Sequence, residues 1–152
     1  MVMRGLRRFA EINGRERRLL IEAVCWLALA RLALILIPFP RLARRLGRFV
    51  PPDEARRVSA AIPRSDADAG LALEVSRAVA RAAGHAPFEA VCLPRALAAR
   101  MMLERRGVAS VIHFGAAKLS EKPFDAHAWL DAAGVEVTGY PVAVFSEIGC
   151  FV

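Results

Sequence analysis

The chain changes its pattern at Gly107, and this change restricts the folds open to it. Before this residue apolar side chains recur at helical spacing, and after it β-branched and aromatic residues dominate three short runs. The runs are Val108–Lys118, Phe124–Asp131 and Val135–Tyr140, and Val142–Phe145 suits a short fourth strand. Ala132-Ala133-Gly134 has the composition of a tight turn. Helices followed by antiparallel strands are the signature of an α+β fold, which the sequence therefore predicts.

Five helical segments are expected before the strands. They are Arg15–Leu36, Arg41–Phe49, Asp53–Ala61, Ser65–Ala83 and Arg95–Arg106. Pro38 and Pro40 end the first segment, because proline removes a backbone donor and clashes with the preceding turn. Ser65 and Asp68 form a capping box at the start of the fourth, and Gly107 is the C-terminal glycine of the last.

The segment Arg15–Leu36 is the most apolar of the five. A membrane-spanning helix needs about 20 mostly apolar residues. Here Glu22 lies near one end and Arg31 interrupts the middle, where an arginine costs roughly 2.5–3.5 kcal/mol even on the lenient insertion scales. We therefore expect a helix that is buried on most sides, or one docked on another protein or on a membrane surface. Cys25 is expected to be a packing residue.

Positive charge is concentrated in the first part of the chain. Residues 1–57 contain 13 arginines and 5 acidic residues, whereas residues 58–152 contain 9 basic and 10 acidic residues. We therefore divide the chain into a basic helical region, residues 1–62, and a core, residues 63–152. No helix-turn-helix, zinc-finger or aromatic-rich motif accompanies the basic region, so we expect no nucleic-acid partner. A solvated helix face, a membrane surface or an acidic protein suits the charge better.

The three cysteines, Cys25, Cys92 and Cys150, are far apart and include no CxxC pair. A structural zinc site and a disulfide framework are therefore not expected, and nothing in the sequence calls for a metal or a cofactor. Reduced thiols fit a cytoplasmic setting. The first 14 residues lack the apolar stretch and cleavage site of a secretory signal, which agrees with that location.

The stretch around Cys92 carries the candidate chemistry. Cys92 comes at the start of a strongly helical run, where free backbone N–H groups and the positive end of the helix dipole favour a thiolate. His127 follows 35 residues later in a strand-like run. A thiol and an imidazole that meet in space can act as nucleophile and general base in acyl transfer. The alternative is that Cys92 is a small buried apolar residue, as free cysteines usually are.

Several motifs together carry a resemblance to one known family. Two motifs surround the cysteine and two follow it, and a helical preamble precedes them all. They are Phe88-x3-Cys92-Leu93-Pro94-Arg95-Ala96-Leu97, Leu103-Glu104-Arg105-Arg106-Gly107, Phe124-x2-His127-Ala128-Trp129-Leu130, Val137-Thr138-Gly139, and a preamble from Arg18 to Phe39. Together they resemble the transglutaminase-like proteases that mature lasso peptides, and this resemblance covers nearly the whole chain.

This resemblance implies a fold, an activity and partners. The fold is a papain-like or transglutaminase-like core, with the cysteine-bearing helix packed on an antiparallel sheet. The activity is removal of the leader from a ribosomally made precursor, with Cys92 as nucleophile and His127 as base. The partners are the precursor's leader peptide, a small separate leader-recognition protein and a cyclase similar to asparagine synthetase. An association with the inner face of the membrane is also compatible with the basic helices.

The third catalytic residue is where the sequence departs from the family pattern. The family has an Asp late in the strand after the glycine turn, but this chain has Thr138 and Gly139 there. Asp131 shares a strand face with His127, although it lies roughly 13 Å along the strand, and we take it as the candidate. A backbone carbonyl or Thr138 could orient the imidazole equally well. Glu136 is on the right strand but is expected to point away.

Other residues have simpler interpretations, and two other functions remain open. We interpret His113 as an ordinary sheet residue, His85 as a loop histidine and Cys150 as an incidental thiol. Trp129 either shields the catalytic pair or fills the core, and Arg95 is expected on the helix surface. In place of a peptidase, the chain could be a catalytically idle scaffold that docks through its basic helices, or an acyltransferase that joins amide groups.

Overall fold

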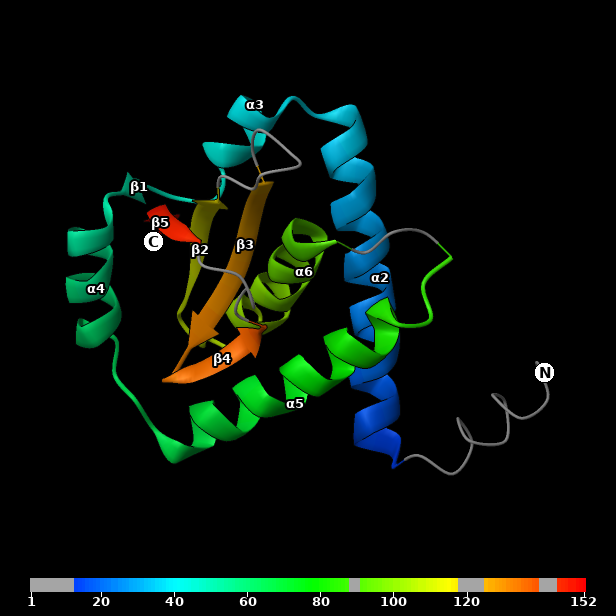
Figure 1. Cartoon of the computed structure of the whole chain (residues 1–152). Coiled ribbons are helices and arrows are strands. Elements are labelled where there is room, and N and C mark those ends of the chain that lie inside the picture. The colour runs from blue at the N-terminus through cyan, green and yellow to red at the C-terminus, as the bar shows by residue number, and fades with distance from the viewer. Residues whose placement is uncertain (1–12, 88–90, 118–124, 140–144) are drawn as a thin grey trace.

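The fold is built from five helices and five strands in the part of the chain that the structure describes. This computed structural model describes residues 13–87, 91–117, 125–139 and 145–152 (Figure 1). The helices are α2 (Gly14–Leu36), α3 (Phe39–Ala43), α4 (Pro52–Ala61), α5 (Asp66–Ala83) and α6 (Cys92–Glu104). The strands are β1 (Phe49–Val50), β2 (Ser110–Ala117), β3 (Asp125–Ala132), β4 (Val135–Thr138) and β5 (Ser146–Phe151). The α+β prediction is confirmed.

Local sequence signals set the ends of the main helices. The Asn13 side chain accepts a hydrogen bond from the Arg15 amide at the start of α2. The Ser65 hydroxyl accepts one from the Asp68 amide at 3.0 Å, so the predicted cap of α5 is confirmed. Gly107 has a φ of 72° just after α6, a left-handed conformation that glycine adopts without a steric penalty.

The strands form one sheet in the order β1-β5-β2-β3-β4, and each of these pairings is antiparallel. Strands β2 and β3 pair without interruption from Ser110 opposite Ala132 to Ala117 opposite Asp125. The tight turn that leads into β4 has positive φ angles at Ala133 and Gly134. Because side chains alternate along a strand, the regular β2–β3 register fixes which residues share each face.

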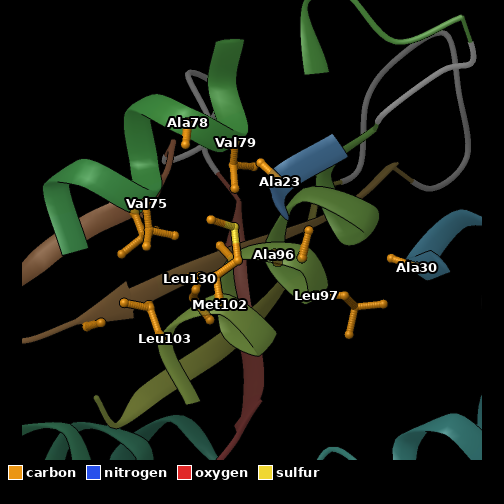
Figure 2. Close-up of a cluster of buried hydrophobic side chains, with 14 of the residues drawn as sticks. Ala23, Ala30, Val75, Ala78, Val79, Ala96, Leu97, Met102, Leu103 and Leu130 are labelled. Atoms are coloured by element: carbon orange, nitrogen blue, oxygen red, sulfur yellow. The ribbon is translucent and has the colours of Figure 1, made fainter. Parts of the chain in front are cut away.

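Helices α5 and α6 pack against one face of the sheet, and α2 packs against both of these helices (Figure 1). Their contact surfaces are rich in alanine, including Ala23 of α2, Ala78 of α5 and Ala96 of α6, and the small side chains let the helices approach closely. Met102 and Leu103 of α6 fill the space toward Leu130 of β3 (Figure 2). The first helix therefore shares one hydrophobic core with the cysteine-bearing helix.

Helix α4 lies on the opposite face of the sheet. It contributes Ala55 to a smaller buried cluster that also contains Val50, Val111 and Cys150. These residues come from β1, β2 and β5, so this cluster holds the β1 edge of the sheet to α4. The division of the chain at residues 62 and 63 stays a prediction, although α2 and β1 both pack against elements of the proposed core.

Two of the sequence predictions are wrong, the helix over Arg41–Phe49 and the packing role of Cys25. The helix expected over Arg41–Phe49 ends at Ala43, and Phe49 instead pairs with Phe151 in the sheet. The last strand is Ser146–Phe151, while residues 142–144 of the expected fourth strand lie outside the described residues. Cys150 is therefore fully buried. Cys25 is exposed, because it lies on the side of α2 that faces away from the core.

Two glycines give matched tests of this architecture. A Cβ at Gly149 would lie 2.5 Å from Cζ of Phe49 and 2.7 Å from the Val50 carbonyl oxygen, whereas a Cβ at Gly70 on α5 would meet nothing within 4 Å. We expect Gly149→Ala to lower the free energy of unfolding by about 1–3 kcal/mol through overpacking of the β1–β5 pair. Gly70→Ala is expected to raise it by about 0.5–1 kcal/mol. Urea unfolding measures both, and equal effects of the two substitutions would contradict the β1–β5 pairing.

Candidate active site

Cys92 is the first residue of α6, on a helix that the core holds firmly. The N-cap residue is Val91, which makes no side-chain hydrogen bond to the first turn. Pro94 is buried in that turn and has no N–H to satisfy. The thiol is partly exposed, while the next turn of the helix, beginning at Ala96, is buried. The thiol therefore sits beside backbone N–H groups at the positive end of the helix.

His127 lies near the start of β3, opposite Gly115 of β2, and is partly exposed. Its Nε2 atom is 3.3 Å from the carbonyl oxygen of Gly139. A carbonyl oxygen can only accept a hydrogen bond, so this contact requires a proton on Nε2. In the neutral ring the lone pair is then on Nδ1. A thiol proton would therefore be accepted at Nδ1.

The group that contacts Nε2 of His127 is therefore a backbone carbonyl. The sequence left three groups open for orienting the imidazole: Asp131, Thr138 and a backbone carbonyl. The Thr138 hydroxyl is buried and accepts a hydrogen bond from the Leu130 amide at 3.0 Å. Asp131 lies against a different imidazole, with its Oδ2 atom 3.4 Å from Nε2 of His113. The expected role of Asp131 as the third catalytic residue stays a prediction that these contacts do not favour. Glu136 is exposed, and a Cβ at Gly139 would lie 3.6 Å from its Oε1 atom.

The two predicted catalytic residues are on different sides of the sheet. Leu130 belongs to the core under α6, so the alternation of β3 puts His127 and Trp129 on the face that α6 does not cover. In the described part of the chain no hydrogen bond joins the Cys92 thiol to the His127 ring. Residues 88–90 and 118–124, which precede the two groups, lie outside the described residues. The pairing of Cys92 with His127 stays a prediction.

Comparison with known proteins settles the family. The sequence profile of the transglutaminase-like superfamily matches residues 33–149, which include both Cys92 and His127. The chain belongs to the transglutaminase-like superfamily. No curated protein and no solved structure matches the chain. Cysteine peptidases and acyltransferases are common in this superfamily, so an activity based on a cysteine nucleophile is expected of this transglutaminase-like protein.

Aromatic rings surround the imidazole of His127. The Trp129 ring stacks beside it with centroids 6.2 Å apart and an interplanar angle of 22°, and the Phe145 ring lies 5.6 Å away. The other side of Trp129 stacks on His113 at 5.4 Å and 6°. Gly115 makes room for this stack, because a Cβ there would lie 3.0 Å from Trp129 Cζ3. Trp129 thus packs between two imidazoles and limits the movement of His127.

His113 forms a buried charged cluster that the sequence did not reveal. Its Nδ1 atom is 2.6 Å from Oε1 of Glu147 on β5, and its Nε2 atom faces Asp131 on β3. Burial is the largest single influence and opposes protonation, but the two carboxylates together outweigh it and raise the pKa of His113 above 6.5. The prediction of an ordinary sheet residue missed these contacts, because it did not place Glu147 in a strand. Among the described residues, no group of three or more His, Cys, Asp or Glu side chains is arranged to hold a metal ion.

The raised pKa of His113 predicts how stability depends on pH. The protonated ring is stabilised in the folded state, so its contribution is fully present below the unfolded pKa and is lost as pH rises through the folded pKa. We expect the difference in unfolding free energy between wild type and His113→Gln to be largest just below about pH 6.5 and to shrink at higher pH. Urea unfolding across this range measures it, with the exposed His85→Gln variant as control. A difference that grows with pH would contradict the assignment.

The three thiols should react at different rates. Burial is the main reason that the pKa of Cys150 is raised to about 11, with smaller contributions from Glu147 and Glu54. Cys25 is exposed in the middle of a helix, and Cys92 alone is at a helix N-terminus. We expect iodoacetamide to modify Cys92 first, because the backbone N–H groups of the first turn of α6 can stabilise the attacking sulfur. Peptide mass mapping over time measures this order. Equal and slow labelling of Cys92 and Cys25 would count against a reactive thiol.

Proposed function

We propose that this transglutaminase-like protein is a cysteine peptidase that removes the leader from a ribosomally made lasso-peptide precursor. The superfamily match supports a cysteine-based activity, and the motifs around Cys92 and His127 support the lasso-peptide role. The single observation that carries the mechanism is the hydrogen bond from Nε2–H of His127 to the Gly139 carbonyl oxygen. It leaves Nδ1 of the imidazole as a base.

The proposed reaction is acyl transfer to sulfur followed by hydrolysis. Nδ1 of His127 takes the thiol proton, and the Cys92 sulfur attacks the carbonyl carbon of the scissile peptide bond. Free N–H groups in the first turn of α6 are suitably placed to stabilise the oxyanion. His127 then returns the proton to the departing amine, and the leader stays attached to Cys92 as a thioester. Water, deprotonated by His127, hydrolyses the thioester and releases the leader.

This mechanism requires contact between Sγ of Cys92 and Nδ1 of His127. Hydrogen bonds between catalytic groups often form only when substrate is bound. The proposal therefore places this contact in the complex with the precursor, and it requires the His127 end of β3 to move toward the N-terminus of α6, because the alternation of β3 turns His127 to the face that α6 does not cover. A small leader-recognition protein and the cyclase remain the proposed partners, as the resemblance of the motifs implies. The cyclase would use the new N-terminus that cleavage exposes.

The acyltransferase alternative shares the first half of the mechanism. The same thioester would react with an amine in place of water and yield a new amide. The mass of the product separates the two functions, because hydrolysis adds one water to the leader. The scaffold alternative predicts neither product.

Substitution of the two proposed catalytic residues tests the function. We expect Cys92→Ala to abolish cleavage of the precursor and His127→Ala to lower its rate by about 10²–10⁴-fold, because each removes a group needed for proton transfer and attack. Mass spectrometry of the precursor, incubated with the chain and the leader-recognition protein, measures cleavage. Cys25→Ser and His85→Ala are the controls, since both residues are exposed and lie outside the proposed site. Full activity of His127→Ala would overturn the proposed pair.

A further inference from the structure

Helix α2 has two opposite faces, and both are apolar. Its buried stripe, Leu19, Ala23, Leu27 and Ala30, packs into the core. Its other side, here called the outer face, carries six large exposed apolar side chains. They are Ile21, Val24, Leu29, Leu32, Ile35 and Leu36. Each exposed residue between Ile21 and Leu36 is apolar or is Cys25, and the two charged residues in this range, Glu22 and Arg31, are only partly exposed.

The outer face is larger and more continuous than the apolar surface that a soluble domain normally exposes. Scattered exposed apolar residues are normal, but a contiguous patch marks a binding surface. The outer face runs for 16 residues of helix, roughly 24 Å at 1.5 Å per residue. Ile35 and Leu36, at its end, are 66% and 69% exposed, and Phe39 of α3 continues the surface. The core is already complete without these side chains.

Unpaired arginines lie at both ends of the outer face. Arg17 and Arg18 are exposed at its N-terminal end, and Arg41, Arg44 and Arg45 are exposed beyond its C-terminal end. None of these five forms an ion pair with another residue in the described part of the chain. Other arginines do: Arg15 pairs with Glu74, Arg81 with Glu16, and Arg106 with Glu22. Arg57, Arg64, Arg77 and Arg95 also form no ion pair in this part of the chain, but five of the unpaired arginines flank the apolar surface.

The helix is long and apolar enough to cross a membrane by length and composition, but its contacts oppose a transmembrane position. The Glu22 carboxylate accepts two hydrogen bonds from the Arg106 guanidinium, at 2.6 and 3.1 Å. Ala23 and Ala30 of α2 pack near Val79 of α5 and Leu97 of α6 (Figure 2). A spanning helix would have to give up these contacts. A helix that lies along the surface keeps all of them.

We propose that the outer face of α2 binds the surface of a bilayer that contains anionic phospholipid. The helix axis would lie parallel to the membrane, with the apolar side chains among the upper acyl chains. The arginines at both ends would contact lipid phosphates. The arginines are complementary in charge to anionic phospholipid, which favours a bilayer as the occupant. The apolar composition of the outer face also favours it, because protein–protein interfaces of this size normally contain hydrogen-bonding groups as well. This proposal does not depend on the peptidase activity.

Co-sedimentation of the full chain with vesicles tests the proposal. We expect binding to vesicles made of equal parts of phosphatidylglycerol and phosphatidylcholine, much weaker binding to phosphatidylcholine alone, and weaker binding at high salt. Leu32→Gln combined with Ile35→Gln should weaken binding by about tenfold or more, because it removes apolar surface. Arg44→Gln combined with Arg45→Gln should remove the preference for anionic vesicles. Leu73→Gln, at an exposed apolar position on α5, is the matched control and should bind like wild type.

Cys25 gives an independent readout, because it lies on the outer face. Anionic vesicles should slow its reaction with a charged maleimide and leave the reaction of Cys92 unchanged. The proposal is overturned if neither vesicle binds the chain, or if the Leu32/Ile35 variant binds as tightly as wild type. It is also overturned if Cys25 is protected to the same extent in the absence of vesicles because the chain forms a dimer. Sedimentation velocity detects such a dimer. The same holds if Cys25 is protected only by the leader-recognition protein.

Discussion

The packing of α6 between the sheet and the helix pair α2–α5 is the constraint on which the rest of the structure depends. Ala96, Ala98 and Ala99 let α6 lie close to its neighbours, and Met102 and Leu103 anchor it to the sheet. Because the helix cannot shift without opening this core, the position of its first residue, Cys92, is fixed by packing. The backbone N–H groups beside the thiol belong to the helix terminus itself, so no other residue has to supply them. Core stability and candidate chemistry thus rest on the same helix.

The opposite face of the sheet differs, because polar and aromatic side chains contact one another there. There Trp129 separates two imidazoles that have different surroundings. His113 is buried between two carboxylates, which raise its pKa, whereas His127 is partly exposed and donates to a backbone carbonyl. The charged cluster ties β2, β3 and β5 together, and this holds Trp129 in place. The orientation of His127 therefore depends on a network that includes three strands.

Much of this architecture could be predicted from local sequence, and the failures have a common cause. The Ser65 cap, the Gly107 terminus and the turn before β4 are signals within a few residues, and each is found in the structure. Strands β1 and β5 were missed because Phe49 pairs with Phe151, about 100 residues away, and no local pattern records such a pairing. Asp131 shares a face with His127 as predicted, but the β2–β3 register puts His113 within its reach. Cys25 was misplaced because a helix that is apolar all round is usually buried.

The claim that most needs a direct test is that Cys92 carries the acyl group during cleavage. The precursor, the leader-recognition protein and the full chain can be mixed, stopped in acid and analysed by intact-protein and peptide mass spectrometry. The account predicts a transient adduct with the mass of the leader on the peptide that contains Cys92, released by hydroxylamine as expected of a thioester. It also predicts that the adduct forms much more slowly in His127→Ala. Leader removal that persists in Cys92→Ala, or an adduct on Cys25 or Cys150, would contradict it.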